Sequence, residues 1–166
     1  MIITFAIITI IYSLLILAFC YHWRDEDSSS PNITNTDTPL VSVIVAFRNE
    51  EKNLPALVES LLAQSYGKLE IILVNDHSDD NSLAVAKSYH DSRIKVIDAS
   101  DVVVGKKAAL KLGYEKSSGE ILYFTDADCI LKRECIETII AEMRGKKYAM
   151  ACGPVCYSNS KGFVNG

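Results

Sequence analysis

Two kinds of apolar pattern follow one another along residues 40–157. Short runs rich in β-branched residues are typical of strands buried on both faces, and they occupy residues 40–47, 69–74, 94–97 and 121–125. Between them, apolar residues at helical spacing predict helices over residues 54–62, 82–89, 106–114 and 136–143. A further run at residues 148–152 predicts a fifth strand. Strands that alternate with helices predict a Rossmann-like, mainly parallel α/β sheet flanked by helices.

Local signals support the predicted helix starts. Pro55 stands where the first turn of a helix tolerates proline. Asn81 and Ser82 are residue types that cap the next helix. Lys106 lies near the start of the third helix of this series, where the backbone N–H groups favour an anion.

The N-terminal segment has a different pattern. Residues 2–20 are apolar except for Thr4, Thr9 and Ser13, which is about the length of one bilayer-spanning helix. Aromatic residues at 21 and 23 resemble an interfacial belt, and Arg24 favours a cytoplasmic C-terminal side. We therefore expect residues 2–22 to be a single-pass membrane anchor, with the body in the cytoplasm. A cleaved signal peptide is the alternative, although no positive charge precedes the apolar run.

A polar segment separates this run from the body. Residues 23–38 are acidic and rich in Ser, Asn and Thr, which predicts a flexible linker. Residues 39–166 form the predicted globular domain. The sequon at Asn32 has meaning only if this segment enters a secretory lumen.

Charge and cysteine content exclude some classes. The chain has 17 Lys and Arg against 21 Asp and Glu, without a basic stripe, so we expect no nucleic-acid partner. Five irregularly spaced cysteines do not form a disulfide framework. Cys152 and Cys156 could begin a zinc site, but no further Cys or His set completes four ligands. Buried free thiols are the better interpretation.

Charged and turn-forming residues follow each of the first four predicted strands. Because ligands of open α/β sheets bind at the carboxyl ends of the strands, these residues are the candidates for chemistry. They are residues 48–51, 75–80, 98–107 and 126–128. The first strand is not followed by G-x-G-x-x-G or by a phosphate-binding G-x-x-x-x-G-K-[ST], which disfavours dehydrogenases and P-loop NTPases.

Asp126 and Asp128 are the most specific of these candidates. Two carboxylates one residue apart, directly after a strand, can face one side and bind Mg²⁺ or Mn²⁺. Such a metal neutralises charge on a departing diphosphate. The pattern also occurs at Asp25 and Asp27 in the linker, so a solvated loop is the alternative; only the later copy follows a strand.

Asp76 and Lys106 are weaker candidates when taken alone. The Asp76 carboxylate, just after a strand, could accept hydrogen bonds from a base or ribose, and turn formation is the alternative. Lys106 could bind an anion or be a solvated surface lysine.

Four segments together carry a resemblance to a known family. They are residues 41–51 (VSVIVAFRNEE), 72–78 (ILVNDHS), 105–110 (GKKAAL) and 119–128 (GEILYFTDAD). In order and spacing they resemble a family 2 glycosyltransferase of the GT-A fold, over residues 40–157. The resemblance implies a nucleotide-sugar donor, usually a UDP-sugar, a divalent metal, and a lipid or glycan acceptor.

The resemblance also implies roles for individual residues. Donor-nucleotide contacts fall on the first-strand segment with Ala46, Phe47 and Glu50, and on Asp76. Lys106 is expected near the nucleotide or diphosphate. Asp126 is expected at the donor and the metal, and Asp128 at the metal. For the complete enzyme, the family implies direct displacement with inversion.

The sequence departs from the family pattern at several positions. The family often has Pro and Tyr where this chain has Ala46 and Arg48, and Asp-Asp-Gly-Ser where it has residues 75–78. His77 thus stands where a turn usually takes glycine. The catalytic base is expected beyond Gly166, so the chain is interpreted as a truncated, donor-binding half. A non-catalytic sugar-nucleotide-binding membrane module and a nucleotidyltransferase of similar fold are the alternatives.

Overall fold

The computed structural model describes residues 2–22, 38–101, 104–146 and 148–153. The chain divides into two compact units, Met1–Ser30 and Pro31–Gly166. The first contains helix α1 (Ile2–His22), which covers the residues predicted to be helical there. Apolar side chains such as Phe5 and Leu15 are exposed on it.

Among the described residues, no helix qualifies by length and hydropathy as a membrane span. The membrane anchor expected at residues 2–22 stays a prediction. The linker expected at residues 23–38 lies outside the described residues, apart from Thr38.

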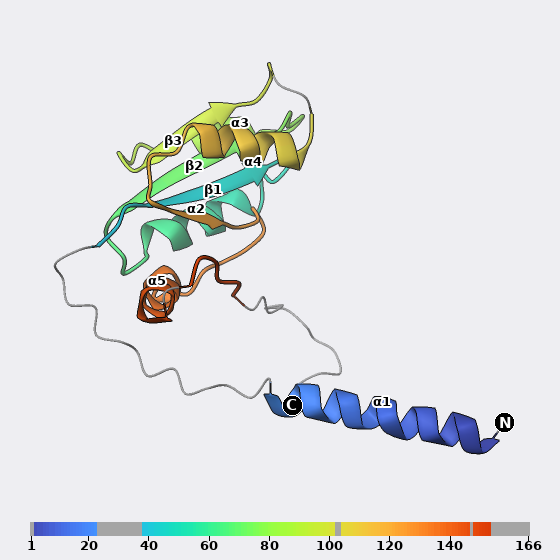
Figure 1. Ribbon diagram of the computed structural model, residues 1–166. Helices are drawn as coiled ribbons and strands as arrows, with labels where there is room; N and C mark the ends of the chain where they lie inside the picture. The colour runs from blue at the N-terminus through green and yellow to red at the C-terminus, as the bar shows by residue number, and fades with distance from the viewer. Residues whose placement is uncertain (1, 23–37, 102–103, 147, 154–166) are drawn as a thin grey trace. The chain divides into compact units, whose positions relative to one another are not determined.

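The second unit is built on a four-stranded parallel sheet (Figure 1). Its strands are β1 (Val41–Phe47), β2 (Leu69–Asn75), β3 (Ile94–Asp98) and β4 (Ile121–Phe124). Its helices are α2 (Leu54–Leu62), α3 (Ser82–Lys87), α4 (Lys106–Glu115) and α5 (Cys135–Lys146). The strand order is β3-β2-β1-β4. The predicted alternation of four strands and four helices is therefore confirmed.

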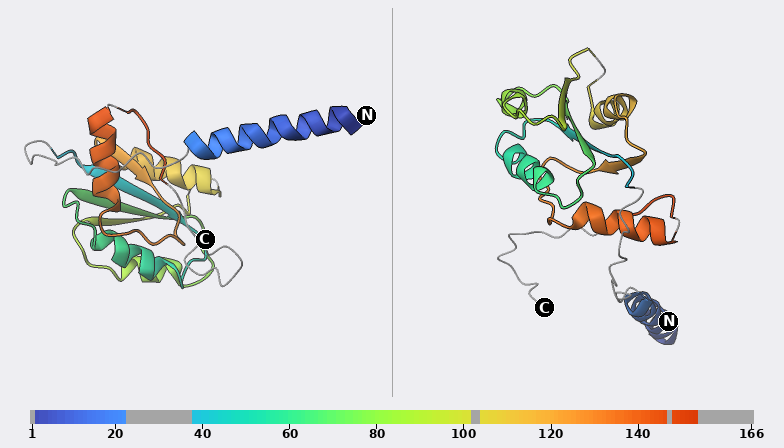
Figure 2. Two further views of the ribbon diagram at one scale, coloured as in Figure 1. Left: turned by 90° about the horizontal axis from the view of Figure 1, so that it is seen from below. Right: turned by 90° about the vertical axis from the view of Figure 1, so that its left-hand side faces the viewer.

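Helices cover both faces of the sheet (Figure 2). Side chains of β1 and β2 that point to one face pack with α2, α3 and α5, as Val43, Leu57 and Ile136 do. Side chains on the other face, including Ile44 and Val74, pack against α4. All seven residues of β1 are buried, as the continuous apolar run predicted.

The fifth strand predicted at residues 148–152 is wrong. These residues form no strand, and the side chains of Tyr148 and Met150 are 54% and 79% exposed. A strand requires a neighbour for its backbone hydrogen bonds, and an apolar run alone does not supply one. In the described part of the chain, the sheet therefore ends at β4.

Two smaller predictions also need correction. Asn81 occupies the N-cap position of α3, but its side chain makes no capping bond. The Asp80 carboxylate accepts the Ser82 N–H at 2.9 Å instead. The thiols of Cys129 and Cys135 are free but only partly buried, and Cys152 is exposed, so the expectation of buried thiols is wrong for these three.

A partly buried polar network joins the amino-terminal end of the sheet to the turn before β4. The Ser42 hydroxyl donates to Glu70 Oε1 at 2.6 Å and accepts the Gly119 N–H at 2.7 Å. Ser118 donates its N–H and its hydroxyl to the two Glu70 oxygens, at 2.8 and 2.7 Å. Partial burial alone would raise the pKa of Glu70, but the hydrogen bonds from Ser42 and Ser118 lower it below its ordinary value.

Gly119 is required at this turn because the backbone of β1 approaches it closely. A Cβ at position 119 would lie 2.6 Å from the Ser42 nitrogen and 2.9 Å from the Leu40 oxygen. We predict that Gly119→Ala lowers the free energy of unfolding by about 1–3 kcal/mol, because rigid backbone atoms must move. Gly67→Ala is the control, since a Cβ there meets nothing within 4 Å. Urea unfolding followed by circular dichroism checks this, and equal effects of the two substitutions would contradict it.

The lowered pKa of Glu70 makes stability depend on pH. Because the folded carboxylate holds its proton less tightly than the unfolded one, it stabilises the fold above the unfolded pKa, and this contribution is lost as the pH falls. We predict that Glu70→Gln is less stable than the wild type at pH 7, by about 1 kcal/mol. The difference should shrink between about pH 5 and pH 3. The exposed Glu134→Gln is the control; a pH-independent difference for Glu70→Gln would exclude the carboxylate as its cause.

Candidate functional site

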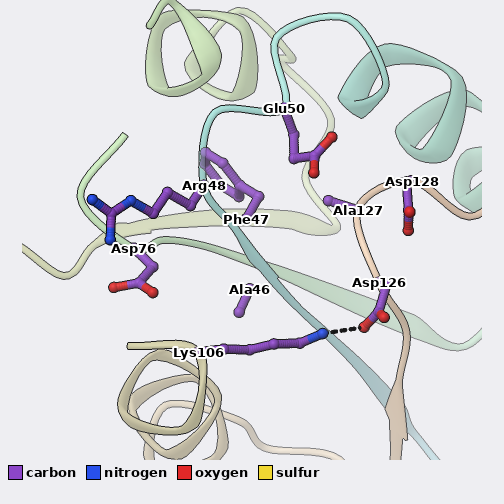
Figure 3. A pocket seen from close by; sticks show the side chains of 9 residues that line it. All are labelled: Ala46, Phe47, Arg48, Glu50, Asp76, Lys106, Asp126, Ala127 and Asp128. Carbon is purple, nitrogen blue, oxygen red and sulfur yellow. Dashed lines mark hydrogen bonds and ion pairs between the residues drawn. The ribbon is translucent and has the colours of Figure 1, made fainter. Parts of the chain in front are cut away.

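The strand order creates a crevice at the carboxyl edge of the sheet. The chain runs from β1 outward to β2 and β3, and then returns to the other side of β1 as β4. Loops on the two sides of β1 diverge at such a reversal, where α/β proteins bind ligands. A cavity of about 250 Å³ lies at this place. Its lining is formed by Ala46, Phe47, Arg48, Glu50, Asp76, Lys106, Asp126, Ala127 and Asp128 (Figure 3).

The structure brings all seven site residues predicted from the sequence to this one cavity. Ala46, Phe47 and Glu50 come from the end of β1, Asp76 from the end of β2, and Lys106 from the start of α4; Asp126 and Asp128 follow β4. Arg48 and Ala127 also line the cavity; they lie in candidate segments of the sequence, but sequence reasoning gave neither of them a role. The signal for Arg48 was its departure from the family pattern at the end of a strand.

The Asp76 carboxylate is held in one orientation at the cavity wall. Its side chain is only 8% exposed. Oδ1 accepts the Gly105 N–H at 2.9 Å and lies 3.2 Å from His77 Nδ1. Oδ2 makes no hydrogen bond with the described residues, and no buried side-chain oxygen among them lacks a partner. Oδ2 therefore retains access to the cavity that Asp76 lines.

The turn that carries Asp76 contains a residue in the left-handed region. His77 has a φ of 57°, which lies in the left-handed region of the backbone. Glycine adopts this region most easily, and the family pattern usually has glycine at this position. Asn75 closes the turn, since its Oδ1 accepts the Ser78 N–H at 3.1 Å and its Nδ2 donates to Asp98 at 2.9 Å. His77 therefore adopts the left-handed turn at the position where the family pattern usually has glycine.

The loops after β1 and β2 are hydrogen-bonded to each other. Asn49, at a φ of 56°, donates its N–H to the Ser78 hydroxyl, and its side chain accepts the Asp79 N–H at 2.7 Å. The Glu50 N–H donates to the Ser82 hydroxyl at 2.8 Å. A hydrogen bond from Ser82 also lowers the pKa of Asp80. These contacts fix the backbone that follows Arg48 and the backbone that follows Asp76.

Lys106 and Asp126 form an ion pair across the cavity (Figure 3). Lys106 Nζ lies 2.7 Å from Asp126 Oδ1, and both side chains are 58% exposed. The pair therefore adds little to stability. The pair does place the Lys106 ammonium group at the start of α4, beside the Asp126 carboxylate that follows β4. This end of the cavity therefore has a positive charge that could bind an anion.

Three carboxylates, from Glu50, Asp126 and Asp128, line the same end of the cavity (Figure 3). Among the described residues, no set of three or more His, Cys, Asp or Glu side chains is grouped closely enough to enclose a metal ion. Mg²⁺ is typically held by one or two carboxylates, with phosphate oxygens and water as its other ligands. The exposed Asp126 and Asp128 fit that kind of site.

The segment after Asp128 is tied to α2. Gln64 is 8% exposed; its Nε2 donates to the Lys132 oxygen at 2.8 Å, and its Oε1 accepts the Ile136 N–H at 3.1 Å. The Ser60 hydroxyl accepts the Leu131 N–H at 3.1 Å. The loop that bears the two aspartates is thus anchored at its far end, near the start of α5.

Comparison with known proteins identifies the family. Residues 42–166 match the family model described as Glycosyl transferase family 2. The chain therefore belongs to this family, and its parallel sheet with flanking helices is of the GT-A type, as the motifs predicted.

Individual relatives and solved structures agree with this assignment. The chain is 34% identical over 116 residues to glycosyltransferase GlyG of Streptococcus pneumoniae, which covers 69% of this chain and 38% of GlyG. It is 30% identical over 136 residues to 4,4'-diaponeurosporenoate glycosyltransferase of Staphylococcus aureus, covering 80% of this chain and 36% of that protein. This chain thus spans less than two-fifths of the length of these relatives.

Two solved structures share the fold. S. aureus TarS 1–349 in complex with UDP-GlcNAc gives a TM-score of 0.59 at 26% identity, over 64% of this chain and 31% of TarS 1–349. The mannosyltransferase PcManGT from Pyrobaculum calidifontis, in complex with GDP-Man and Mn²⁺, gives 0.60 at 26% identity. That match covers 65% of this chain and 33% of PcManGT.

Proposed function

We propose that the protein is a glycosyltransferase that takes its sugar from a UDP-sugar, and that this chain carries the donor-binding part. The observation that supports this most strongly is the convergence of Asp76, Lys106, Asp126 and Asp128 on one cavity at the sheet reversal. The related structures contain UDP-GlcNAc and GDP-Man, both of which are nucleotide-sugars.

The two ends of the cavity suit the two ends of such a donor. At one end Asp76 offers Oδ2 as an acceptor for an N–H of the base. At the other end Lys106 supplies positive charge for the diphosphate. Asp126 and Asp128 would hold Mg²⁺ or Mn²⁺ there. A bound divalent cation supplies charge neutralisation on the departing nucleotide diphosphate.

The transfer that follows is direct displacement at the anomeric carbon by an acceptor hydroxyl, with inversion. A lipid or a glycan supplies this hydroxyl, and a base outside the residues considered for the donor site removes its proton. In this scheme the described residues bind and orient the donor.

Titration with UDP tests the donor site directly. We predict that the full chain binds UDP and that Mn²⁺ or Mg²⁺ tightens the binding, as measured by isothermal titration calorimetry. Asp128→Asn should reduce the metal-dependent gain by about tenfold, because a charged ligand to the cation is lost. Asp27→Asn is the matched control, since Asp25 and Asp27 repeat the same spacing in the linker.

Two outcomes would contradict the proposal. Equal affinity for UDP and an adenine nucleotide, with no effect of metal, would remove the donor site. Equal losses in Asp128→Asn and Asp27→Asn would show that position after a strand does not matter.

We also propose that α1 attaches the protein to a membrane, with the body in the cytoplasm. The uncharged sequence of residues 2–20 and the exposed apolar side chains of α1 support this. The full chain is predicted to stay in the membrane fraction after alkaline carbonate washing, whereas a chain starting at Pro39 is released. External protease should leave the body intact in spheroplasts. A body digested from outside, or a mature N-terminus near Cys20, would contradict this topology.

A further inference from the structure

Arg48 is a cation that lines the cavity and has no hydrogen-bond or ion-pair partner among the described residues. Its side chain is exposed and, in the part of the chain that the structure describes, makes no hydrogen bond or ion pair. The other cation of the cavity, Lys106, is paired with Asp126. A guanidinium has five donors and no acceptor, so its partner must be an acceptor or an anion.

The place of Arg48 in the cavity narrows the choice of partner. Figure 3 shows its guanidinium on the same side as Asp76, with Ala46 between this side and the Asp126–Asp128 side. The backbone at this position is rigid, because the neighbouring Asn49 is bonded to Ser78 and Asp79. Arg48 therefore belongs to the end of the cavity where Asp76 offers its free oxygen.

One oxygen of the Asp76 carboxylate is available to a base. Oδ1 is already occupied by the Gly105 N–H and faces His77, which leaves Oδ2. Uracil presents a single N–H flanked by two carbonyl groups, and this edge matches one acceptor oxygen next to a donor. Guanine presents two adjacent donor groups, which a carboxylate binds best with both of its oxygens.

We infer that Arg48 is a specificity-determining residue that donates to the uracil O4 carbonyl while Asp76 accepts the adjacent N3–H. This inference rests on the proposed function, since it requires the donor to be a uridine nucleotide. Cytosine replaces the O4 acceptor by an amino donor, which a guanidinium opposes. Arg48 thus selects uridine over cytidine.

Binding of three ligands to three proteins tests this inference. The proteins are the wild type, Arg48→Ala and Lys107→Ala, the last being an exposed lysine at the start of α4 that does not line the cavity. The ligands are UDP with Mn²⁺, uridine and CDP with Mn²⁺, measured by calorimetry and, for the weaker uridine, by ligand-observed NMR. Arg48→Ala should lose about tenfold in affinity for both UDP and uridine, and its preference for UDP over CDP should narrow. Lys107→Ala should match the wild type.

The uridine measurement separates a base contact from a phosphate contact. If Arg48→Ala weakens UDP but not uridine, the guanidinium binds phosphate and the inference is overturned. If the wild type binds UDP and Arg48→Ala binds it equally well, the inference fails while the donor site stands. If the wild type binds no UDP, both fail. Thermal unfolding followed by circular dichroism is the control that checks whether the Arg48→Ala variant is folded.

Discussion

The pairing of β1 on both of its edges determines where the site residues lie. Every residue of β1 is buried, and the strand pairs in parallel with β2 along its whole length and with β4 over its first four residues. A shift of one residue would break both ladders and turn its apolar side chains to the wrong face. Ala46 and Phe47 are therefore fixed at the carboxyl edge, and the residues that follow them must enter the crevice.

The cavity gathers more negative than positive charge, and the protein stabilises most of it locally. Asp76 is held by a backbone N–H, Asp126 by Lys106, and Glu50 by the Asn53 amide at 2.8 Å. Each of these three carboxylates thus has a different partner, and Asp128 is the fourth carboxylate of the lining. Such an arrangement would fit a divalent cation with a diphosphate, because the carboxylates would hold the cation and Lys106 would face the diphosphate.

The sequence was informative wherever one segment alone decides the structure. The β-branched run of β1 and the helical spacing of α2 specify burial by themselves, and parallel strands necessarily bring Asp76 and Asp126 to one edge. Prediction from the sequence failed where the structure of a segment depends on a residue far away in the chain. Strand formation at residues 148–152 depends on a neighbour, and the Ser42–Glu70–Ser118 network joins segments up to 77 residues apart. The cap of α3 depends on backbone geometry, since Asn81 has a φ of −81° and a ψ of 7° and leaves capping to Asp80.

Two of the departures from the family pattern, Arg48 and His77, lie in turns that are hydrogen-bonded to each other. His77 adopts a left-handed conformation at a cost of about 1 kcal/mol or more, which glycine would avoid. Glycine, however, would have no ring nitrogen 3.2 Å from Asp76 Oδ1. Arg48 stands across the same end of the cavity, in the turn bonded to Ser78 and Asp79. The left-handed turn therefore brings the His77 ring to the same Asp76 oxygen that accepts the Gly105 N–H, and the other oxygen makes no hydrogen bond with the described residues.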